Sequence, residues 1–188
     1  LDKLGSVVGM LTDGKLYLII YTGAAQHYYP KYKPTVEALL AETDEIFPEI
    51  LRTRLATMPG LLELLAALEE SGIPKAIATS SRRSFVDRVL APFDLHGRFA
   101  FILASEDITH GKPHPEVYLS AAEKHGVAPG ELLVLEDSQN GCRAAIAAGA
   151  FAVAVPGEHS RRHDFTGAAF VAESLADPRI YATLGLSP

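Results

Sequence analysis

At residues 132–138 the chain reads Leu-Leu-Val-Leu-Glu-Asp-Ser, four apolar residues followed directly by two carboxylates and a hydroxyl. A short, continuously apolar run of this kind is typical of a strand that is buried on both faces of a parallel sheet. Comparable runs lie at residues 76–78, 101–104, 151–155 and 170–171. The sequence therefore predicts a sheet of buried parallel strands.

Helical patterns separate these apolar runs. Leucines recur at three-to-four spacing over residues 61–68, and Ser71-Gly72 is a typical helix end. Further helical patterns cover residues 85–90, 115–125 and 143–148. Alternation of strands and amphipathic helices predicts an α/β fold, with a Rossmann-like parallel sheet core covered by helices on both faces.

The part of the chain before Met58-Pro59-Gly60 has a different character. Apolar residues at three-to-four spacing in residues 34–47, and a second run that begins at Pro48, indicate mainly helical structure. We predict two parts: a helical module over residues 1–58 and an α/β core over residues 59–188.

Composition excludes several classes of protein. The chain has 188 residues, of which 48% are hydrophobic and 21% charged, and this is ordinary for a folded globular protein rather than a disordered one. Its net charge of −6 disfavours nucleic acid and anionic membrane as partners. The longest apolar stretch of the first half, Leu16 to Ala25, is shorter than the ~20 residues of a membrane span. A single cysteine, Cys142, excludes an internal disulfide framework, and a cytoplasmic location is predicted.

Three polar groups are expected at one edge of the sheet, because ligands of open parallel sheets bind beyond the carboxyl ends of the strands. Thr79-Ser80-Ser81 follows one apolar run, and Glu136-Asp137 follows another. Lys112 lies in the loop before the helix that starts at Pro115. Each group also has a simpler interpretation: the hydroxyl and carboxyl groups as helix N-caps, and the lysine as a solvated loop residue.

Taken together, the three groups favour phosphoryl chemistry. Adjacent carboxylates are costly at a sheet edge unless a cation neutralises them, and two hard oxygen ligands suit Mg²⁺. A hydroxyl and a lysine are the groups that the remaining oxygens of a phosphoryl group require. The residues therefore predict a Mg²⁺-dependent phosphoryl site.

Three stretches resemble motifs of a known family. Residues 76–81, 111–115 and 135–141 are similar to the second, third and fourth motifs of the haloacid dehalogenase-like (HAD) hydrolase superfamily. The likeness is to the branch that contains β-phosphoglucomutase and phosphoglycolate phosphatase, and its most specific parts are Gly-Lys-Pro-x-Pro and Glu-Asp-Ser-x-x-Gly. The resemblance implies that residues 1–58 are the helical cap of that family, incomplete at its start.

The resemblance also implies a role for each site residue. Thr79 would donate its hydroxyl to the transferring phosphoryl group, assisted by the backbone N–H of Ser80. Lys112 would bridge that group and the nucleophilic carboxylate. Asp137, together with Glu136, would hold Mg²⁺.

Other residues receive non-catalytic interpretations. Asn140 and Gly141 are taken as support for the turn into the following helix, and Cys142 as a packing residue. The tyrosine-rich loop at residues 26–33 is either a contact to sugar hydroxyls or an ordinary exposed loop. Four histidines lack a convincing ligand spacing and are interpreted as loop residues: His110, His114, His159 and His163.

The nucleophile of the family is not found in these residues. The family carries it in an Asp-x-Asp-Gly motif and forms an aspartyl-phosphate, but no two aspartates of this chain are two positions apart. The nearest match, Leu11-Thr12-Asp13-Gly14, has leucine at the nucleophile position. We expect the nucleophile strand upstream of Leu1, in agreement with the start at a residue other than methionine. The alternative is that Val7-Val8 is a degenerate first strand.

The expected function is Mg²⁺-dependent phosphoryl transfer on a small phosphorylated metabolite, by a phosphatase of sugar-phosphate or phosphoglycolate type. The alternatives are a β-phosphoglucomutase-like phosphohexomutase and, in a different class, a non-catalytic binding protein that has lost its nucleophile. Dehalogenase chemistry is a minor option. These 188 residues alone are expected to be inactive, and the protein is expected to be a monomer or homodimer.

Overall fold

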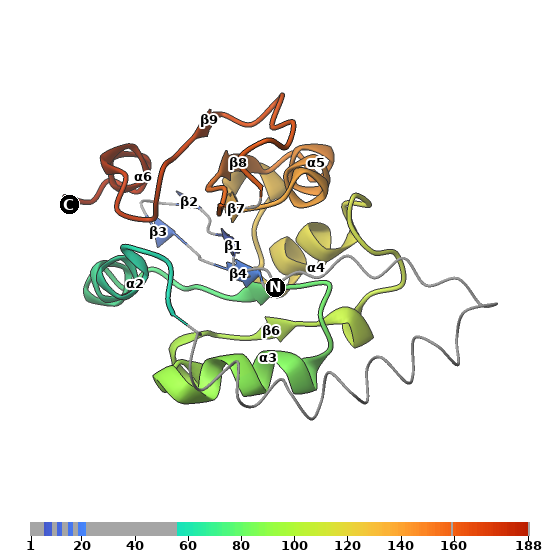
Figure 1. Cartoon of the computed structure of the whole chain (residues 1–188), viewed down its shortest axis with the longest axis horizontal. Coiled ribbons are helices and arrows are strands. Elements are labelled where there is room, and N and C mark those ends of the chain that lie inside the picture. The colour runs from blue at the N-terminus through green and yellow to red at the C-terminus, as the bar shows by residue number, and fades with distance from the viewer. Residues whose placement is uncertain are drawn as a thin grey trace.

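The computed structural model describes residues 56–158 and 160–187, together with four short strands nearer the N-terminus (Figure 1). The strands are β1 (Ser6–Val8), β2 (Leu11–Thr12), β3 (Lys15–Leu16), β4 (Ile19–Tyr21), β5 (Ile77–Ala78), β6 (Ile102–Leu103), β7 (Leu133–Glu136), β8 (Phe151–Ala154) and β9 (Phe170–Val171). The helices are α2 (Leu61–Glu70), α3 (Arg83–Leu90), α4 (Glu116–His125), α5 (Gln139–Ala148) and α6 (Pro178–Thr183). Short 3-10 helices are η2 (Ala91–Phe93), η3 (His96–Arg98), η4 (Ser105–Asp107) and η5 (Pro129–Glu131).

The core strands are parallel, as the sequence predicts. β5 pairs with β6, with Ile77 opposite Ile102, and β7, β8 and β9 form a second parallel set in that order. Helices flank these strands on both sides, and α5 packs on β7 and β8 (Figure 1). The α/β fold class with a Rossmann-like parallel sheet is therefore confirmed.

The hydrophobic core forms where the apolar faces of the helices pack against the strands. Leu64, Leu65 and Leu68 of α2 are fully buried, and so is every residue of β7. Burial of both faces of β7 explains why its sequence is continuously apolar rather than alternating.

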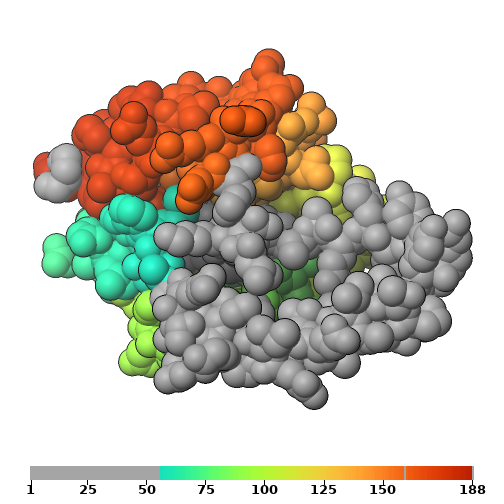
Figure 2. All heavy atoms as spheres, in the orientation of Figure 1, coloured from blue at the N-terminus to red at the C-terminus, as the bar shows by residue number. Residues whose placement is uncertain are grey.

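The start of α2 is held against the C-terminal segment. The Leu175 N–H donates to the carbonyl of Pro59 at 3.1 Å. Gly60 has a φ of +85°, and a Cβ there would lie 2.3 Å from the backbone nitrogen of Ala176, so only glycine fits. Figure 2 shows this junction on one face, where the teal atoms of the α2 region abut the red C-terminal part of the chain.

The N-terminal strands form two antiparallel pairs, β1 with β4 and β2 with β3. β1 and β4 lie next to both β5 and β7, and so between the two parallel sets (Figure 1). Among the described strands, neither joins the hydrogen-bonded ladder of β5 or β7. Among the described strands, the slot between the parallel sets is thus occupied by the antiparallel pair of β1 and β4.

The mainly helical prediction for residues 1–58 is wrong at these four strands. Val7, Val8, Ile19 and Ile20 are β-branched, which favours extended backbone. The predicted helices at residues 34–55, the loop at residues 26–33 and His159 lie outside the described residues. Division of the chain at residue 58 into a cap and a core stays a prediction.

In the part of the chain that the structure describes, no helix is long and apolar enough to cross a membrane.

Candidate functional site

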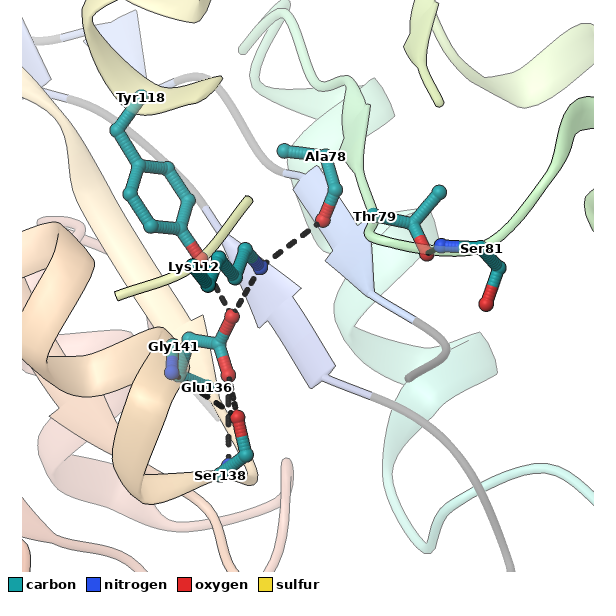
Figure 3. Close-up of polar contacts among 8 residues, drawn as sticks. All are labelled: Ala78, Thr79, Ser81, Lys112, Tyr118, Glu136, Ser138 and Gly141. Atoms are coloured by element: carbon teal, nitrogen blue, oxygen red, sulfur yellow. Dashed lines mark hydrogen bonds and ion pairs between the residues drawn. The ribbon is translucent and has the colours of Figure 1, made fainter. Parts of the chain in front are cut away.

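The site lies at the carboxyl ends of β5 and β7, the position that the sequence predicts. Glu136 is the last residue of β7, and Thr79 directly follows β5. Lys112 reaches between them from the loop before α4: its Nζ donates to the carbonyl of Ala78 at 3.3 Å and forms an ion pair with Oε1 of Glu136 (Figure 3). One cation therefore connects the ends of both parallel sets.

Both oxygens of the buried Glu136 carboxylate accept hydrogen bonds. Oε1 accepts from Lys112 and from the hydroxyl of Tyr118, while Oε2 accepts from the Ser138 hydroxyl at 3.1 Å and from its N–H at 3.3 Å. The Glu136 side chain has no solvent exposure. A buried carboxylate is tolerated only when it is paired and its lone pairs are satisfied, and both conditions hold here.

Gly141 leaves the space that the Glu136 carboxylate fills. A Cβ at Gly141 would lie 1.9 Å from Oε2 of Glu136, which is far inside van der Waals contact. Ser138 is the N-cap of α5, and its hydroxyl accepts from the Gly141 N–H at 3.1 Å. The spacing Glu-Asp-Ser-x-x-Gly is thus explained by packing and capping around one carboxylate.

Lys112 is a buried cation rather than a solvated loop residue. Its side chain is only 2% exposed, so the solvated-lysine interpretation is wrong. Nζ also lies 4.7 Å from the centre of the Tyr118 ring. Burial lowers the pKa of Lys112, whereas the negative charges of Glu136 and Asp137 act in the opposite direction.

Thr79 lies on the other side of the slot. It is fully buried, its N–H donates to the carbonyl of Leu103 at 2.8 Å, and its Oγ1 accepts from the N–H of Ser81 at 3.0 Å. The N-cap of α3 is Arg82, so the interpretation of residues 79–81 as a helix cap is wrong. Figure 3 shows the blue N-terminal strands passing between Thr79 and the cluster around Glu136.

Asp137 follows β7 and is half-buried. Its charge acts on both Lys112 and Cys142, which places the carboxylate within electrostatic reach of the site. Because both Glu136 oxygens already accept hydrogen bonds, Asp137 is the better placed direct ligand for a cation. A carboxylate at this edge fits Mg²⁺, which usually retains waters and shares an oxygen of a substrate phosphate.

Cys142 is a packing residue, as the sequence analysis expects. Its side chain is buried, and burial together with the Glu136 and Asp137 charges raises the pKa of its thiol. A thiol with a raised pKa is a poor nucleophile because little of it is ionised.

Sequence reasoning missed the role of Tyr118. Its side chain is fully buried on the first turns of α4 and donates to Glu136. A buried tyrosine hydroxyl requires a polar partner, and this requirement is the signal that points to the site. The structure also brings His110, His114 and Glu116 together on the outer side of the Lys112 loop, which histidine spacing did not suggest.

The fold and site define an α/β protein with a buried lysine and paired carboxylates at one edge of a parallel sheet. Residues 19–155 match the family model described as haloacid dehalogenase-like hydrolase, and the chain belongs to this family. The resemblance predicted from the three motifs is therefore confirmed.

Similar proteins fall in the expected branch. The plasmid-encoded protein CbbY of Cupriavidus necator is 38% identical over 152 residues, covering 79% of this chain and 60% of that protein. Hexitol phosphatase B of Escherichia coli is 34% identical over 155 residues, covering 82% of this chain and 65% of that protein. The crystal structure of CbbY from Rhodobacter sphaeroides with phosphate matches with a TM-score of 0.69 and 31% identity, covering 76% of this chain and 65% of that one. The chain thus spans 60–65% of the length of these relatives.

Proposed function

We propose that this protein is a Mg²⁺-dependent phosphatase that hydrolyses a small phosphorylated metabolite, of sugar-phosphate or phosphoglycolate type. The observation that carries the proposal is the buried Lys112 cation, which contacts the end of β5 and the Glu136 carboxylate at the end of β7. A fixed positive charge in a water-poor site stabilises the charge that develops on a transferring phosphoryl group.

The other residues act on the same phosphoryl group. In this proposal the Thr79 hydroxyl and the Ser80 N–H donate to its oxygens from the β5 side. Glu136 acts by holding Lys112 in place, through the ion pair described above. Asp137 would hold Mg²⁺, which when bound would neutralise phosphate charge. The sequence-based pairing of Glu136 with Asp137 as metal ligands is corrected here, because both Glu136 oxygens already accept hydrogen bonds. Because these groups are fixed before substrate binds, little reorganisation is needed in the transition state.

The attacking carboxylate is proposed to lie on a strand upstream of Leu1. Asp13 lies outside the described residues, and the strands that precede and follow it in the sequence, β2 and β3, pair antiparallel. The facing edges of β5 and β7 have no ladder with any described strand across the slot. In this proposal the upstream strand takes the place that β1 and β4 occupy in the 188-residue chain, and its carboxylate lies beside Lys112.

A second candidate function is a phosphate-binding protein without turnover. It is favoured by the position of β1 and β4, which lie in the slot where a nucleophile strand would belong. In that case the site retains its cation and its hydroxyl donors but makes no covalent intermediate.

For the partners, we propose a small phosphorylated metabolite with Mg²⁺, on the ground of the buried Lys112 cation. The net charge of −6 disfavours nucleic acid and anionic membrane, and neither is proposed as a partner. We propose a cytoplasmic monomer or homodimer.

The deciding experiment is turnover of p-nitrophenyl phosphate with Mg²⁺ by two chains, the 188-residue chain and the chain encoded with its upstream sequence. We expect no turnover by the shorter chain, turnover by the longer one, and at least a hundredfold lower kcat in Asp137→Asn of the longer one, equivalent to about 3 kcal/mol. Asp87→Asn, an exposed position of α3, is the matched control.

Two results would contradict the phosphatase proposal in different ways. Turnover by the 188-residue chain that disappears in Asp13→Ala would show that the nucleophile lies within these residues. Binding of tungstate by both chains with turnover by neither would favour the non-catalytic protein.

A further inference from the structure

The outer side of the Lys112 loop gathers two imidazoles and a carboxylate. His110 Nδ1 lies 2.7 Å from Oε2 of Glu116, and His114 Nδ1 lies 3.9 Å from the same oxygen. The two imidazole rings are 4.6 Å apart between centres. One ligand atom from each of the three residues lies within 4.8 Å of the others. This is a separation that a single metal ion can span after a small adjustment.

Backbone hydrogen bonds hold the carboxylate of this cluster in place. Glu116 is the first residue of α4, and its two oxygens accept from the N–H groups of Thr109 at 2.5 Å and His110 at 2.8 Å. These bonds lower the pKa of Glu116 to about 2, so the carboxylate is ionised at neutral pH. The Nδ1 of His114 accepts from the Glu116 N–H at 3.3 Å, a long contact that rotation of the ring can exchange for a metal bond.

We propose that His110, His114 and Glu116 bind a divalent transition-metal ion such as Zn²⁺. Two neutral imidazole nitrogens and one carboxylate oxygen are ligands that zinc prefers, and they leave a fourth tetrahedral position for water. At metal–ligand distances of about 2.0–2.1 Å, tetrahedral ligand atoms are about 3.3 Å apart. Since nitrogen ligands disfavour Mg²⁺, this site is chemically distinct from the oxygen-rich position at Asp137.

Metal binding at this site restrains the loop that carries Lys112. His110 and His114 stand two residues before and two residues after the lysine. A metal ion bonded to both, and to the first residue of α4, cross-links the loop to the helix. The His114 N–H already donates to the Gly111 carbonyl at 3.1 Å, so the metal closes a short turn rather than an open segment.

The test is titration of the 188-residue chain with Zn²⁺ in the presence of millimolar Mg²⁺, with a chelating dye as competitor. We expect one zinc ion per chain, and at least about tenfold weaker binding in each of His110→Asn, His114→Asn and Glu116→Gln. His96→Asn is the matched control, because His96 is an exposed histidine 3.7 Å from Asp87 with no third ligand beside it in the described structure. This control is expected to bind zinc as the parent does.

A second measurement does not depend on affinity. Amide hydrogen exchange over residues 110–116 should slow on zinc addition in the parent and stay unchanged in His114→Asn. Absence of zinc binding to the parent, or equal binding by the three ligand variants, overturns the proposal. Asp137→Asn should bind zinc like the parent, so failure of the proposed phosphatase function leaves this test intact.

Discussion

The two sides of the loop at residues 110–116 hold charged groups in opposite surroundings. On the inner side, the Lys112 side chain is 2% exposed and its partner Glu136 is completely buried. On the outer side, His110 and His114 are 63% and 50% exposed around Glu116. Water screens the outer groups and can replace any partner that is removed, whereas the inner groups are shielded from water and depend on partners within the protein. Removal of one charged group should therefore lower the free energy of unfolding much more on the inner side than on the outer side.

The largest effect is expected for Lys112→Met. This change leaves the Glu136 carboxylate buried without its cation, and breaking a buried ion pair in this way costs about 3–5 kcal/mol. The free energy of unfolding, measured by urea denaturation of the 188-residue chain, should fall by that amount. Lys124→Met, an exposed position of α4, should change it by less than about 0.5 kcal/mol.

A double variant tests whether the unpaired charge of Glu136 causes the loss of stability in Lys112→Met. Lys112→Met combined with Glu136→Gln removes both charges, and it should be more stable than Lys112→Met alone. If the double variant is less stable by the sum of the single changes, the two residues are not coupled. The proposed phosphatase function predicts, in addition, that Lys112→Met in the chain encoded with its upstream sequence lowers kcat at least a hundredfold, equivalent to about 3 kcal/mol.

The next effect on the inner side is expected for Tyr118→Phe. The change removes the hydroxyl that donates to Glu136 and keeps the ring that packs in the core. Hydrogen bonds to charged groups contribute about 1.5–3 kcal/mol, and urea denaturation should show a loss in this range. Tyr181→Phe, a buried tyrosine of α6 outside the site, is the control. A loss no larger than that of the control would mean that the other partners of the carboxylate satisfy it without the Tyr118 hydroxyl.

A steric change at the same carboxylate is expected to have a similar or smaller effect. Gly141→Ala places a Cβ on the Glu136 oxygens, and overpacking of a buried position costs about 1–3 kcal/mol. Alanine favours the helix interior over glycine by about 1 kcal/mol, which offsets part of the loss. Gly97→Ala has open space around it and serves as the control. A stabilised Gly141→Ala variant would show that the carboxylate moves aside at low cost.

The sequence predicted the inner side of the loop better than the outer side. α2 covers the predicted leucine stripe, because burial of one helix face leaves a clear periodic pattern. β9 has the predicted bounds although Val171 is exposed. Lys112 and Glu136 were found through their motifs, but the pattern does not say that Glu136 holds the lysine. That contact depends on the packing of Tyr118 and on the missing side chain of Gly141, which are visible only in three dimensions.

The outer cluster of His110, His114 and Glu116 has no recognisable pattern in the sequence. His110 and His114 converge on Glu116 because the chain turns at the start of α4, and loop geometry is not encoded in hydrophobic periodicity. The helical prediction for residues 1–58 was wrong at the N-terminal strands for a related reason. β2 and β3 pair antiparallel, with Thr12 opposite Lys15. In the sequence, an Asp-Gly dipeptide between two short extended runs is a hairpin signal, and the helical pattern of the wider region does not reveal it. The family motif that Asp13 resembles would instead need a parallel strand.

The smallest effect belongs to the outer side, at Glu116→Gln, and it should depend on pH. The pKa of Glu116 is lowered from its ordinary 4.5 to about 2, chiefly by the Thr109 N–H. Its stabilising contribution is therefore complete above about pH 4.5, where the carboxylate is ionised in the folded and the unfolded chain alike. Below that pH the unfolded chain takes up the proton first, and the contribution disappears by about pH 2. Urea denaturation should show Glu116→Gln slightly less stable than the parent at neutral pH, with the difference narrowing as the pH falls through this window. Glu123→Gln, an exposed position of the same helix, is the matched control. A difference for Glu116→Gln that stays constant to pH 2 would mean that the amide-capped carboxylate contributes nothing through its charge, and that only its shape supports the loop.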